Sequence, residues 1–386
     1  MVKPQGFDAV VIGAGVVGAA TALSLSNAGL KVLVVDRGNV AQGTTSAGEG
    51  NILVSDKEPG PELDLALRSR NAWFEINEEV GGGFELEAKG GLVVARSETG
   101  VSGLRTLTSA QRLAGVDAQD IGVDQLRTLE PNLSHSITKG SYYPQDSQCQ
   151  PMLAAAQMLR AAQRNGCEFL SGADVTAIEI VHGAVSGLLT SKGSFSTPIV
   201  INATGTWAGQ IAGLAGSYLP IAPRRGFILV TAPTRQLIFH KVYDAEYVAN
   251  VASGEADLQS SAVVEGTQSG TILIGASRER VGFKDGIEFS VLRILARQAI
   301  ELFPILAGIQ FLRAYRGFRP YAPDHLPVIG EDAMIKGLWH NAGHEGAGIG
   351  LAPASAEIIR DGILGRPTFM NTAPFSPARF SLETAR

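Results

Sequence analysis

The first 36 positions of the chain alternate apolar runs and turns in a pattern typical of a β-α-β unit. Residues 7–12 form a short β-rich apolar run that ends at glycine, and residues 31–36 form a second run that ends at an acid. Such runs, apolar on both faces, indicate buried strands of a parallel sheet. Between them, residues 19–28 have helical character and stop at Gly29, the usual position of a C-terminal cap.

The middle of the chain is less regular and richer in strand patterns. We expect helices over residues 61–80, 106–130, 153–165 and 291–303. We expect strands over residues 84–97, 173–181, 184–190, 199–202, 227–231, 262–265 and 271–275. The strands at 173–202 are expected to form a small meander that leads back into the main sheet. Turn residues separate the last three runs, which predicts an antiparallel sheet.

The C-terminal part returns to an α/β pattern. From Val328 the sequence predicts a strand, a glycine-rich loop and a helix over residues 353–361. The α/β elements therefore lie at both ends of the chain, with the β-rich stretch inserted between them. This arrangement predicts discontinuous domains.

Composition describes an ordinary globular protein with a mildly acidic balance. The 386 residues are 45% hydrophobic and 18% charged, and 37 acidic residues exceed 32 basic ones, for a net charge of −5. A nucleic-acid-binding protein would carry a basic excess instead. Glycine is over-represented, with 46 residues against a usual share of about 7%. The excess suggests many tight turns and close approaches of the backbone to a ligand.

Cysteine usage and hydropathy narrow the class further. Cys149 and Cys167 are too few for a disulfide scaffold and form no CxxC pair, so we expect no metal site. Residues 9–26 carry no charge and are about long enough to span a bilayer. Their regularly spaced glycines and the preceding Asp8 argue against a transmembrane segment, and the first residues make a poor signal peptide. We therefore expect a cytoplasmic protein.

The turn after the first strand carries a dinucleotide-binding pattern. Gly13, Gly15 and Gly18 form G-x-G-x-x-G, which combines a tight turn, a close backbone approach to pyrophosphate and close helix–sheet packing. The helix that follows offers N–H groups and a partial positive charge to phosphates. Asp36 falls where an acid binds ribose hydroxyls. The pattern indicates an ADP-containing dinucleotide, and both NAD and FAD fit it.

A second glycine cluster favours flavin over nicotinamide. Residues 341–353 place glycines and N–H groups at the start of a helix far along the chain. A reduced flavin carries negative charge at its N1–C2=O region, which helix N–H groups can stabilise. A turn followed by an ordinary helix is the alternative interpretation of this segment.

Five segments together resemble the D-amino-acid oxidase family of flavoproteins, which includes glycine oxidase, sarcosine oxidase and bacterial amine and opine dehydrogenase subunits. They are the β-α-β unit and residues 43–51, 199–207, 316–330 and 343–353. The resemblance implies an α/β fold: a Rossmann-like FAD-binding domain with a mostly parallel sheet, plus an inserted antiparallel-sheet substrate domain. The implied bounds are 1–83, 145–220 and 323–386 for the first domain, and 84–144 and 221–322 for the second.

The resemblance also implies which residues contact FAD. They are Gly13, Ala14, Gly15, Val17, Gly18, Asp36, Arg37, Thr44, Thr45, Ser46, Gly48, Gly50, Asn51, Val175, Ala203, Thr204, Gly205, Trp207, Gly343, His344, Gly346, Ala347, Gly348 and Ile349. Members that bind flavin covalently use a cysteine in the C-terminal third, and this chain has none there. We therefore expect non-covalent FAD.

The substrate site is expected around Arg319. A planar guanidinium can hold an α-carboxylate bidentately, and the family's substrate arginine stands at the matching position. Arg316 could share this role or form a structural ion pair, and Tyr247 could contact substrate or pack in the core. His344 could lie beside the flavin or only bind backbone. Glu49 could meet a substrate amine or stay in solvent.

Three functions remain open from the sequence. The first is FAD-dependent oxidation of the C–N bond of an amino or imino acid, in which a neutral amine gives up its α-hydride to flavin N5 and the imine hydrolyses to an oxo acid. The acceptor would then be dioxygen. In the second, the chain is the substrate-oxidising subunit of a heteromeric amine, opine or proline dehydrogenase and passes electrons to a partner subunit. The loop at residues 47–52 resembles the β subunits of such enzymes. The third is a flavin-holding scaffold without amine oxidation. A homo- or hetero-oligomer is compatible with all three, and no hydrolase or P-loop motif is present.

Overall fold

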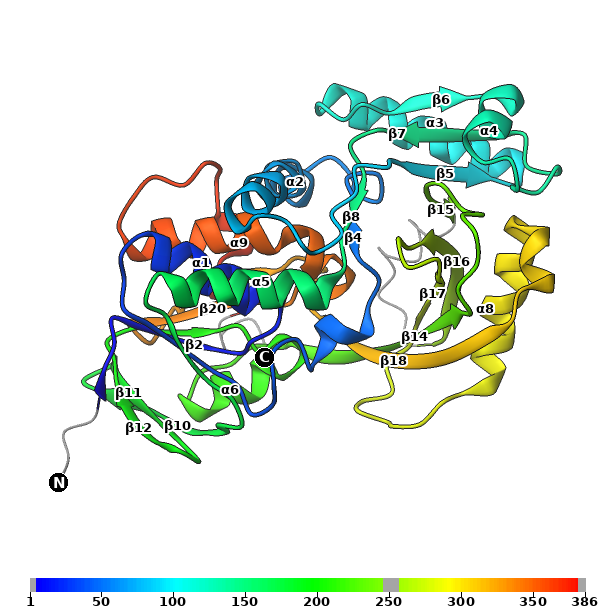
Figure 1. The fold of residues 1–386 in the computed structure, drawn as a ribbon. Helices are drawn as coiled ribbons and strands as arrows, with labels where there is room; N and C mark the ends of the chain where they lie inside the picture. The colour runs from blue at the N-terminus through cyan, green and yellow to red at the C-terminus, as the bar shows by residue number, and fades with distance from the viewer. Residues whose placement is uncertain (1–4, 246–256, 381–386) are drawn as a thin grey trace.

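The computed structural model describes residues 5–245 and 257–380 and contains two large sheets, each with its own apolar core (Figure 1). The first has six strands in the order β19-β20-β13-β2-β3-β9. Their bounds are β19 Val328–Glu331, β20 Leu338–Ala342, β13 Val200–Asn202, β2 Ala9–Ile12, β3 Val32–Val35 and β9 Glu168–Leu170. All neighbours run parallel except β19 and β20, as the buried apolar runs predict.

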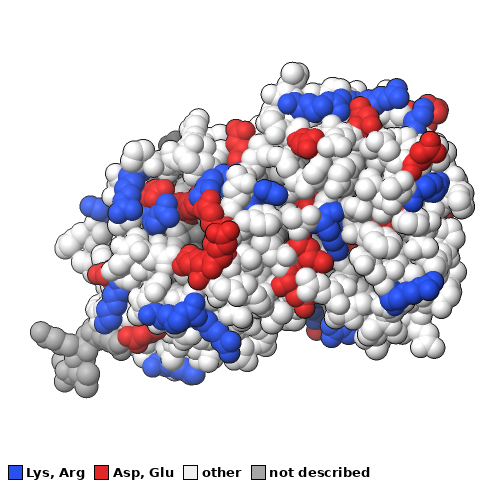
Figure 2. Space-filling view, turned by 45° about the horizontal axis from the view of Figure 1, so that its top comes forward, with Lys and Arg blue, Asp and Glu red and all other residues white. Residues whose placement is uncertain are grey.

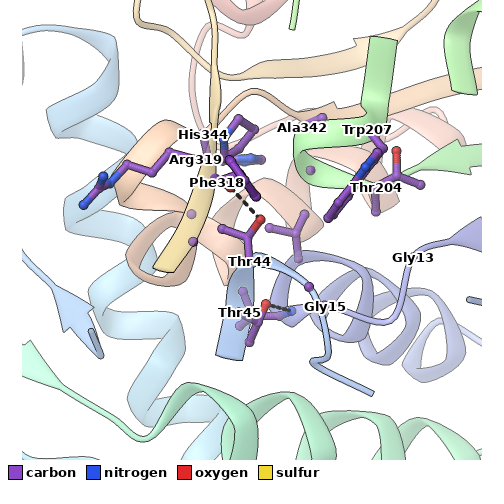
Figure 3. Close-up of a pocket in the computed structure, with 18 of the residues that line it drawn as sticks. Gly13, Gly15, Thr44, Thr45, Thr204, Trp207, Phe318, Arg319, Ala342 and His344 are labelled. Carbon is purple, nitrogen blue, oxygen red and sulfur yellow. Dashed lines mark hydrogen bonds between the residues drawn. The ribbon is translucent and has the colours of Figure 1, made fainter. Parts of the chain in front are cut away.

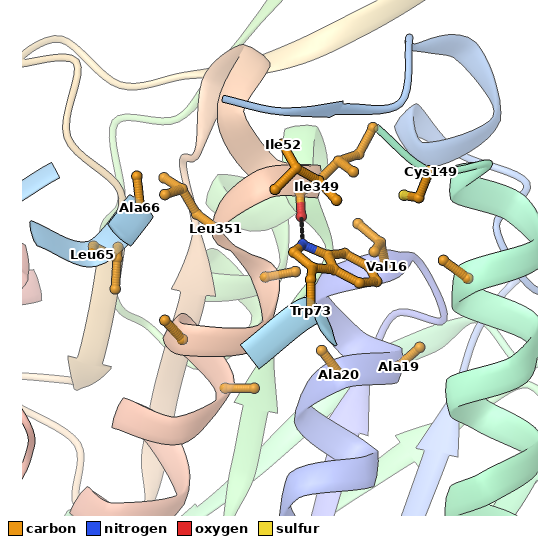
Figure 4. Packing of buried hydrophobic residues seen from close by; sticks show 14 of the residues in the cluster. Val16, Ala19, Ala20, Ile52, Leu65, Ala66, Trp73, Cys149, Ile349 and Leu351 are labelled. Atoms are coloured by element: carbon orange, nitrogen blue, oxygen red, sulfur yellow. Dashed lines mark hydrogen bonds between the residues drawn. The ribbon is translucent and has the colours of Figure 1, made fainter. Parts of the chain in front are cut away.

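Four helices cover one face of this sheet. They are α1 (Val16–Asn27), α2 (Pro61–Val80), α5 (Pro151–Arg164) and α9 (Gly348–Ile363). Helix α1 carries small residues where it packs, among them Ala19 and Ala20, so α5 and α9 approach it closely. Figure 4 shows these alanines beside Trp73 of α2 and Ile349 of α9. The predicted helices at 61–80 and 153–165 are confirmed within two residues.

Helix α9 begins earlier than the sequence predicts. The expected glycine-rich loop before Pro353 is instead a 3-10 turn, η4 (Glu345–Ala347), followed directly by the helix from Gly348. Pro353 lies inside the helix and lacks the N–H that would bond the carbonyl of Ile349. The indole of Trp73 donates to that carbonyl at 3.1 Å instead (Figure 4). A side chain from another helix thus compensates for the proline.

The second sheet has eight strands in the order β18-β14-β17-β16-β15-β5-β7-β6. Their bounds are β18 Phe311–Tyr321, β14 Ala222–Thr231, β17 Ile272–Arg278, β16 Gln259–Gly266, β15 Lys241–Asp244, β5 Gly91–Ala95, β7 Lys139–Tyr143 and β6 Gln119–Ile121. Neighbours are antiparallel except β15 and β5. Helix α8 (Phe289–Leu302) packs on β14, β16 and β17 (Figure 1). The predicted antiparallel strands and the helix at 291–303 are confirmed.

Two smaller predictions are confirmed only in part. Residues 106–130 are not one helix but α3 (Glu98–Leu113), strand β6 and α4 (Val123–Leu129). Gly115 adopts φ +90°, which ends the helical run, and β6 then pairs with β7. The β pattern at 84–97 contributes only β5.

The predicted meander forms a small sheet of its own and then leads into the main sheet, as expected, through β13. Strands β10 (Val175–Val181), β11 (Ala184–Thr190) and β12 (Gly193–Ser196) are antiparallel neighbours. Strand β1 (Gln5–Gly6) adds a parallel edge to β12. The remaining pair, β4 (Asn51–Ile52) and β8 (Ser147–Gln148), forms a short two-stranded ribbon.

The face of the molecule shown in Figure 2 has no strongly charged region, and no described helix has the character of a membrane span. Acidic and basic side chains are interspersed on the face in Figure 2, without a broad field of one sign. Within residues 5–245 and 257–380, none of the helices combines the length and apolarity needed to cross a membrane.

Candidate active site

A cavity of about 800 Å³ lies between the two sheets. One wall contains Ile12, Ala203 and Ala342, at the carboxyl ends of β2, β13 and β20, and the opposite wall is formed by β14 and β18. Ligands of open α/β sheets bind outside the carboxyl ends of the strands. Figure 3 shows Gly13 and Arg319 on opposite sides of this space.

Most of the predicted site residues line the cavity. They are Gly13, Gly15, Val17, Asp36, Arg37, Thr44, Thr45, Gly48, Asn51, Val175, Ala203, Thr204, Gly205, Trp207, Arg319, His344, Gly346, Gly348 and Ile349. Glu49 lines it too, which removes the alternative of a solvent position. The chain brings these residues together from both sheets and from segments more than 300 residues apart in the sequence.

The glycine turn closes one end of the cavity. Gly13 has φ +111°, and a Cβ there would lie 2.6 Å from the carbonyl oxygen of Ala203. A Cβ on Gly18 would lie 1.8 Å from the carbonyl oxygen of Gly13. The N-terminus of α1 opens on the cavity at Gly15, whose cap position carries no side-chain hydrogen bond. This is the geometry that lets a phosphate approach backbone N–H groups.

Asp36 and Thr45 fix that turn from the side. The Asp36 carboxylate accepts hydrogen bonds from the N–H groups of Ala14 and Gly38, both at 2.7 Å. Each carboxylate oxygen has capacity for a second donor such as a ribose hydroxyl. The Thr45 hydroxyl accepts from the N–H of Val16 at 3.0 Å. Sequence reasoning thus placed Asp36 at the cavity but did not foresee that it also braces the glycine turn.

Stacked aromatic side chains pack around Trp207 at the same end of the cavity. The Arg37 guanidinium lies 4.4 Å from the ring centre of Trp207, and Trp207 stacks on Phe283 at 5.6 Å between ring centres, with 10° between their planes. Phe283 in turn contacts Phe318 edge-on at 5.2 Å. This stack connects the six-stranded sheet's wall to β18. Phe283 had no sequence signal.

The carbonyl of Phe318 joins strand β18 to the loops that carry Thr44 and Thr206. The Phe318 oxygen accepts from the hydroxyl of Thr44 at 2.8 Å and from that of Thr206 at 2.7 Å. A Cβ on Gly317 would lie 2.8 Å from Ala47, so only glycine permits this approach. The consequence is that Arg319, two residues further on, is held at a fixed position against the cavity (Figure 3).

Arg319 enters the cavity from β18. Its Nη1 donates to the carbonyl oxygen of Ser277 at 2.7 Å. A Cβ on Gly226 would lie 2.2 Å from Nη1, so glycine at this place in β14 leaves the room that the guanidinium fills. Gly346 of η4 lies on the other side of the arginine, where an added Cβ would be 3.5 Å from Nε of Arg319.

His344 is buried at the start of η4, 3% exposed. Its Nε2 lies 3.0 Å from the Ser355 hydroxyl. Burial lowers the pKa of His344 to about 3. The imidazole is therefore neutral around pH 7 and contributes shape and hydrogen bonding to the cavity wall, without charge.

Some predicted residues lie outside the cavity. Ala14, Ser46 and Gly343 do not line it, although lining residues flank each of them in the sequence, and Ala347 lines a smaller neighbouring cavity. Gly18 packs against the Gly13 turn, and Gly50 contacts the Cys149 carbonyl. The Arg316 guanidinium pairs with Asp285, with its Nε 2.7 Å from the carboxylate, and does not line the cavity. Tyr247 falls outside the residues that the structure describes.

Sequence reasoning missed several lining residues. They include Gln42, Ala173, Asp174, Gln210, Gly226, Ile228, Gly317, Phe318 and Asn341. Gly317, Phe318 and Asn341 stand inside segments whose pattern was noticed, so adjacency could have found them. Gly226 and Ile228 lie on β14, a strand that the sequence predicted from its apolar run alone. No local sequence pattern indicated that either residue lines a cavity.

The residues present fit a flavin dinucleotide. The glycine cradle and the α1 N-terminus suit a pyrophosphate, and the strand-end acid suits a ribose. Three buried oxygens in the wall, Asn51 Oδ1, Asn341 Oδ1 and Glu49 Oε1, find no hydrogen-bond partner among the described residues. Buried polar atoms of this kind are normally satisfied, so they fit a ligand that carries donors. No group of three or more metal-binding side chains occurs in the described part of the chain.

The fold and cavity define a flavin-dependent oxidoreductase, and comparison with known proteins gives the family. The chain belongs to the DAO family, described as FAD dependent oxidoreductase, whose model matches residues 8–361. The enzyme is thus FAD-dependent, as the sequence resemblance implies.

Relatives and solved structures cover nearly the whole chain. Hydrogen cyanide synthase subunit HcnC of Pseudomonas aeruginosa is 28% identical, covering 98% of this chain and 97% of its own length. Glycine oxidase of Geobacillus kaustophilus is 27% identical over 97% of both chains. Its crystal structure matches with a TM-score of 0.88, at 25% identity, over 97% of this chain and 99% of its own. That of L-proline dehydrogenase from P. horikoshii matches with a TM-score of 0.89, at 25% identity, over 99% of both. The α/β fold is confirmed.

Proposed function

We propose that the enzyme oxidises the C–N bond of an amino or imino acid, with loss of the α-hydrogen as hydride and hydrolysis of the imine to an oxo acid. The observation that carries this proposal is the position of Arg319, at the opposite side of the cavity from the phosphate-binding turn. A guanidinium in a partly buried wall is suited to a carboxylate, which it can bind through two parallel hydrogen bonds.

The side chains position the substrate and do little covalent chemistry. Bound FAD would supply the hydride acceptor. The carbonyl of Ser277 accepts a hydrogen bond from Nη1 of Arg319, which restricts the orientation of the guanidinium plane. The neutral His344 and the N-terminus of α9 form the adjoining wall. A carboxylate held at Arg319 would restrict where the α-carbon can lie, which is the orientation effect that oxidation requires.

Anaerobic bleaching of the flavin absorbance tests the proposal. The panel contains amino acids, N-methyl amino acids, prolines and opines, each beside the amine that lacks its carboxylate. Bleaching by at least one amino or imino acid, and not by its decarboxylated partner, is the expected outcome. Bleaching by decarboxylated amines alone, or by none of the compounds, would contradict the proposed substrate class.

A second candidate is the role of substrate-oxidising subunit in a heteromeric dehydrogenase. The relative HcnC is itself named as a subunit, and L-proline dehydrogenase shares the fold over nearly its whole length. The electron acceptor would then be a partner subunit and not dioxygen. Peroxide release by the isolated chain during turnover would favour the oxidase. Anaerobic bleaching without aerobic peroxide would favour the subunit.

We also propose that residues 84–144 and 221–322 act as the substrate domain.

We propose further that FAD is bound without a covalent link. Cys149 and Cys167 are both buried, and neither lines the cavity. Burial raises the pKa of both thiols, so they stay protonated near neutral pH. Acid precipitation should release all the flavin as FAD, and flavin that remains with the protein would contradict the proposal.

A further inference from the structure

Glu49 is a buried carboxylate in the cavity wall with one oxygen left for a ligand. It is 6% exposed and lines the same cavity as Arg319. Its Oε2 accepts from Asn51 Nδ2 at 3.2 Å and lies 3.6 Å from Lys241 Nζ. Its Oε1 has no hydrogen-bond partner within the described ranges. An unsatisfied buried carboxylate oxygen is costly, so this atom fits a site for a donor that arrives with the ligand.

Glycines on two neighbouring strands make room for the two charged side chains. A Cβ on Gly275 of β17 would lie 2.7 Å from Glu49 Oε1. A Cβ on Gly226 of β14 would lie 2.2 Å from Arg319 Nη1. Strands β14 and β17 are hydrogen-bonded neighbours, so one stretch of sheet accommodates both an acid and a base. The pairing matches the two charges of a zwitterion.

Glu49 belongs to a buried cluster that contains two carboxylates and one ammonium group. Lys241 of β15 pairs with Glu265 of β16 and also lies near Glu49, and all three residues are at most 6% exposed. Burial raises the pKa of Glu49. The charge of Lys241 lowers this pKa in part, and the charge of Glu265 raises it further. A cation at Oε1 would be attracted by the Glu49 carboxylate and would offset its repulsion from Glu265.

We propose that Glu49 recognises the amine of the substrate: its Oε1 accepts an N–H of the substrate ammonium and takes one proton from it, while Arg319 holds the carboxylate. This inference rests on the proposed function, because it requires an amino- or imino-acid substrate. The N–H bond breaks with its electron pair left on nitrogen, and the proton forms an O–H bond on Glu49. The resulting neutral amine is the form from which an α-hydride can leave. The ligand class is therefore the α-amino or α-imino acid zwitterion.

Two non-oxidisable probes isolate amine recognition. In 2-aminoisobutyrate the α-carbon carries an ammonium group and no hydrogen, and in pivalate a methyl group replaces that ammonium. Binding of each to the FAD-loaded protein is measured from the shift of the flavin absorbance. Wild type should prefer 2-aminoisobutyrate by about tenfold or more, and Glu49→Gln should remove that preference while keeping pivalate binding. Arg319→Lys should weaken both probes.

The pH profile provides a second readout, since a merely structural Glu49 would leave its shape unchanged. The charged and titratable groups that face Glu49 are Lys241, Glu265, Tyr315 and Arg319, on β15, β16 and β18. With Glu49 present, a substrate ammonium can bind and be deprotonated in place, so kcat/KM should reach a plateau below the pKa of the free amine. In Glu49→Gln only the neutral amine reacts, so kcat/KM should keep rising with pH up to that pKa.

Gly275→Ala tests the same contact without removing the charge. Its methyl group would displace Oε1, so the preference for 2-aminoisobutyrate should fall here too. Equal binding of both probes by wild type, or a preference that survives in Glu49→Gln, would overturn the role of Glu49 while leaving the carboxylate site intact. Failure of wild type to bind either probe would instead count against the proposed function, and the inference would fall with it.

Discussion

The two ends of the cavity are built in opposite ways. At the end proposed to hold the FAD phosphates, called the phosphate end, glycines and backbone N–H groups form the wall, and a Cβ at Gly13 or Gly18 would meet a carbonyl oxygen at 2.6 Å or less. At the end proposed to hold the substrate, called the substrate end, charged side chains form the wall: Glu49 and Arg319 enter through gaps left by glycines of the antiparallel sheet. The first end depends on the close approach of main-chain atoms, and the second depends on charge balance in a buried environment.

The difference predicts different consequences of mutation. A substitution at the phosphate end should damage the fold and FAD binding together, because the same atoms serve both. A substitution at the substrate end should damage substrate recognition while FAD stays bound, because we assign the FAD phosphates to the glycine turn at the other end. The first three experiments below test this separation, and the fourth tests the burial of His344 in the cavity wall.

Gly18→Ala should have the largest effect. Its Cβ would lie 1.8 Å from the Gly13 carbonyl oxygen, so the turn must move. We expect a loss of about 3 kcal/mol or more in stability, together with the loss of FAD. Thermal unfolding and flavin content measure both. Gly103→Ala is the matched control, because a Cβ there, in α3, meets nothing within 4 Å, and this change should be neutral or slightly stabilising. FAD retention by Gly18→Ala would contradict the assignment.

Arg319→Ala should cut kcat/KM for the substrate by about two to three orders of magnitude, equivalent to roughly 3–4 kcal/mol. Arg319→Lys keeps the charge but not the fork geometry, so its loss should be intermediate. The FAD spectrum and Tm should change little. A decarboxylated amine is the control substrate and should lose little activity. If both substrates lose activity equally, or FAD dissociates, Arg319 is structural and the comparison between the two ends fails.

Asp36→Ala should weaken FAD binding by about 1–3 kcal/mol, because ribose hydroxyls lose a charged acceptor. The structure adds a second cause: the N–H groups of Ala14 and Gly38 lose their partner. Asp36→Asn keeps an acceptor oxygen and should lose less. FAD affinity is measured from flavin fluorescence, and an unchanged value for Asp36→Ala would show that the acid does not serve the cofactor.

His344 should make stability fall in acid. Its pKa is lowered from 6.5 to about 3 in the folded state, mainly by burial. Between these values the unfolded chain binds a proton that the folded chain does not, so stability falls as the pH falls from 6.5 to 3. At pH 5 this effect lowers the free energy of unfolding by about 2 kcal/mol relative to its value at neutral pH. His344→Asn should flatten the denaturation profile in this window, and an unchanged slope would contradict the burial argument.

The phosphate end was predictable from the sequence because its pattern is local. Gly13, Gly15 and Gly18 fall within six residues, and the strands on either side carry continuous apolar runs. Arg319 was predictable through the family resemblance, and the structure places it in the cavity. Each of these positions could be identified from a short stretch of chain.

The substrate end was harder because its contacts are non-local. Glu49, Lys241 and Glu265 come from a loop and two strands far along the chain, and no spacing rule joins them. The early start of α9 was missed for the same reason: Trp73, 276 residues from Ile349, satisfies the carbonyl that Pro353 leaves unbonded. For Arg316 the sequence left two roles open, a share in the role of Arg319 or a structural ion pair. Side chains on a strand alternate in direction with period two, so residues three apart face opposite sides, and Arg316 pairs with Asp285 outside the cavity.

The stacking of Trp207 on Phe283 also gives the protein an intrinsic fluorescence probe. Trp207 stands in the cavity wall, whereas Trp73 is buried in the core between α1, α2 and α9. Indole emission overlaps the absorption of the isoalloxazine ring, so a bound flavin would quench Trp207 by energy transfer. Because Phe283 follows β17 and Trp207 follows β13, a shift of one sheet against the other would also change the stacking and the emission wavelength. The chain has three tryptophans, so in a variant in which Trp73 and Trp339 are replaced by phenylalanine, Trp207 alone would report both cofactor loading and movement between the sheets, with no label attached.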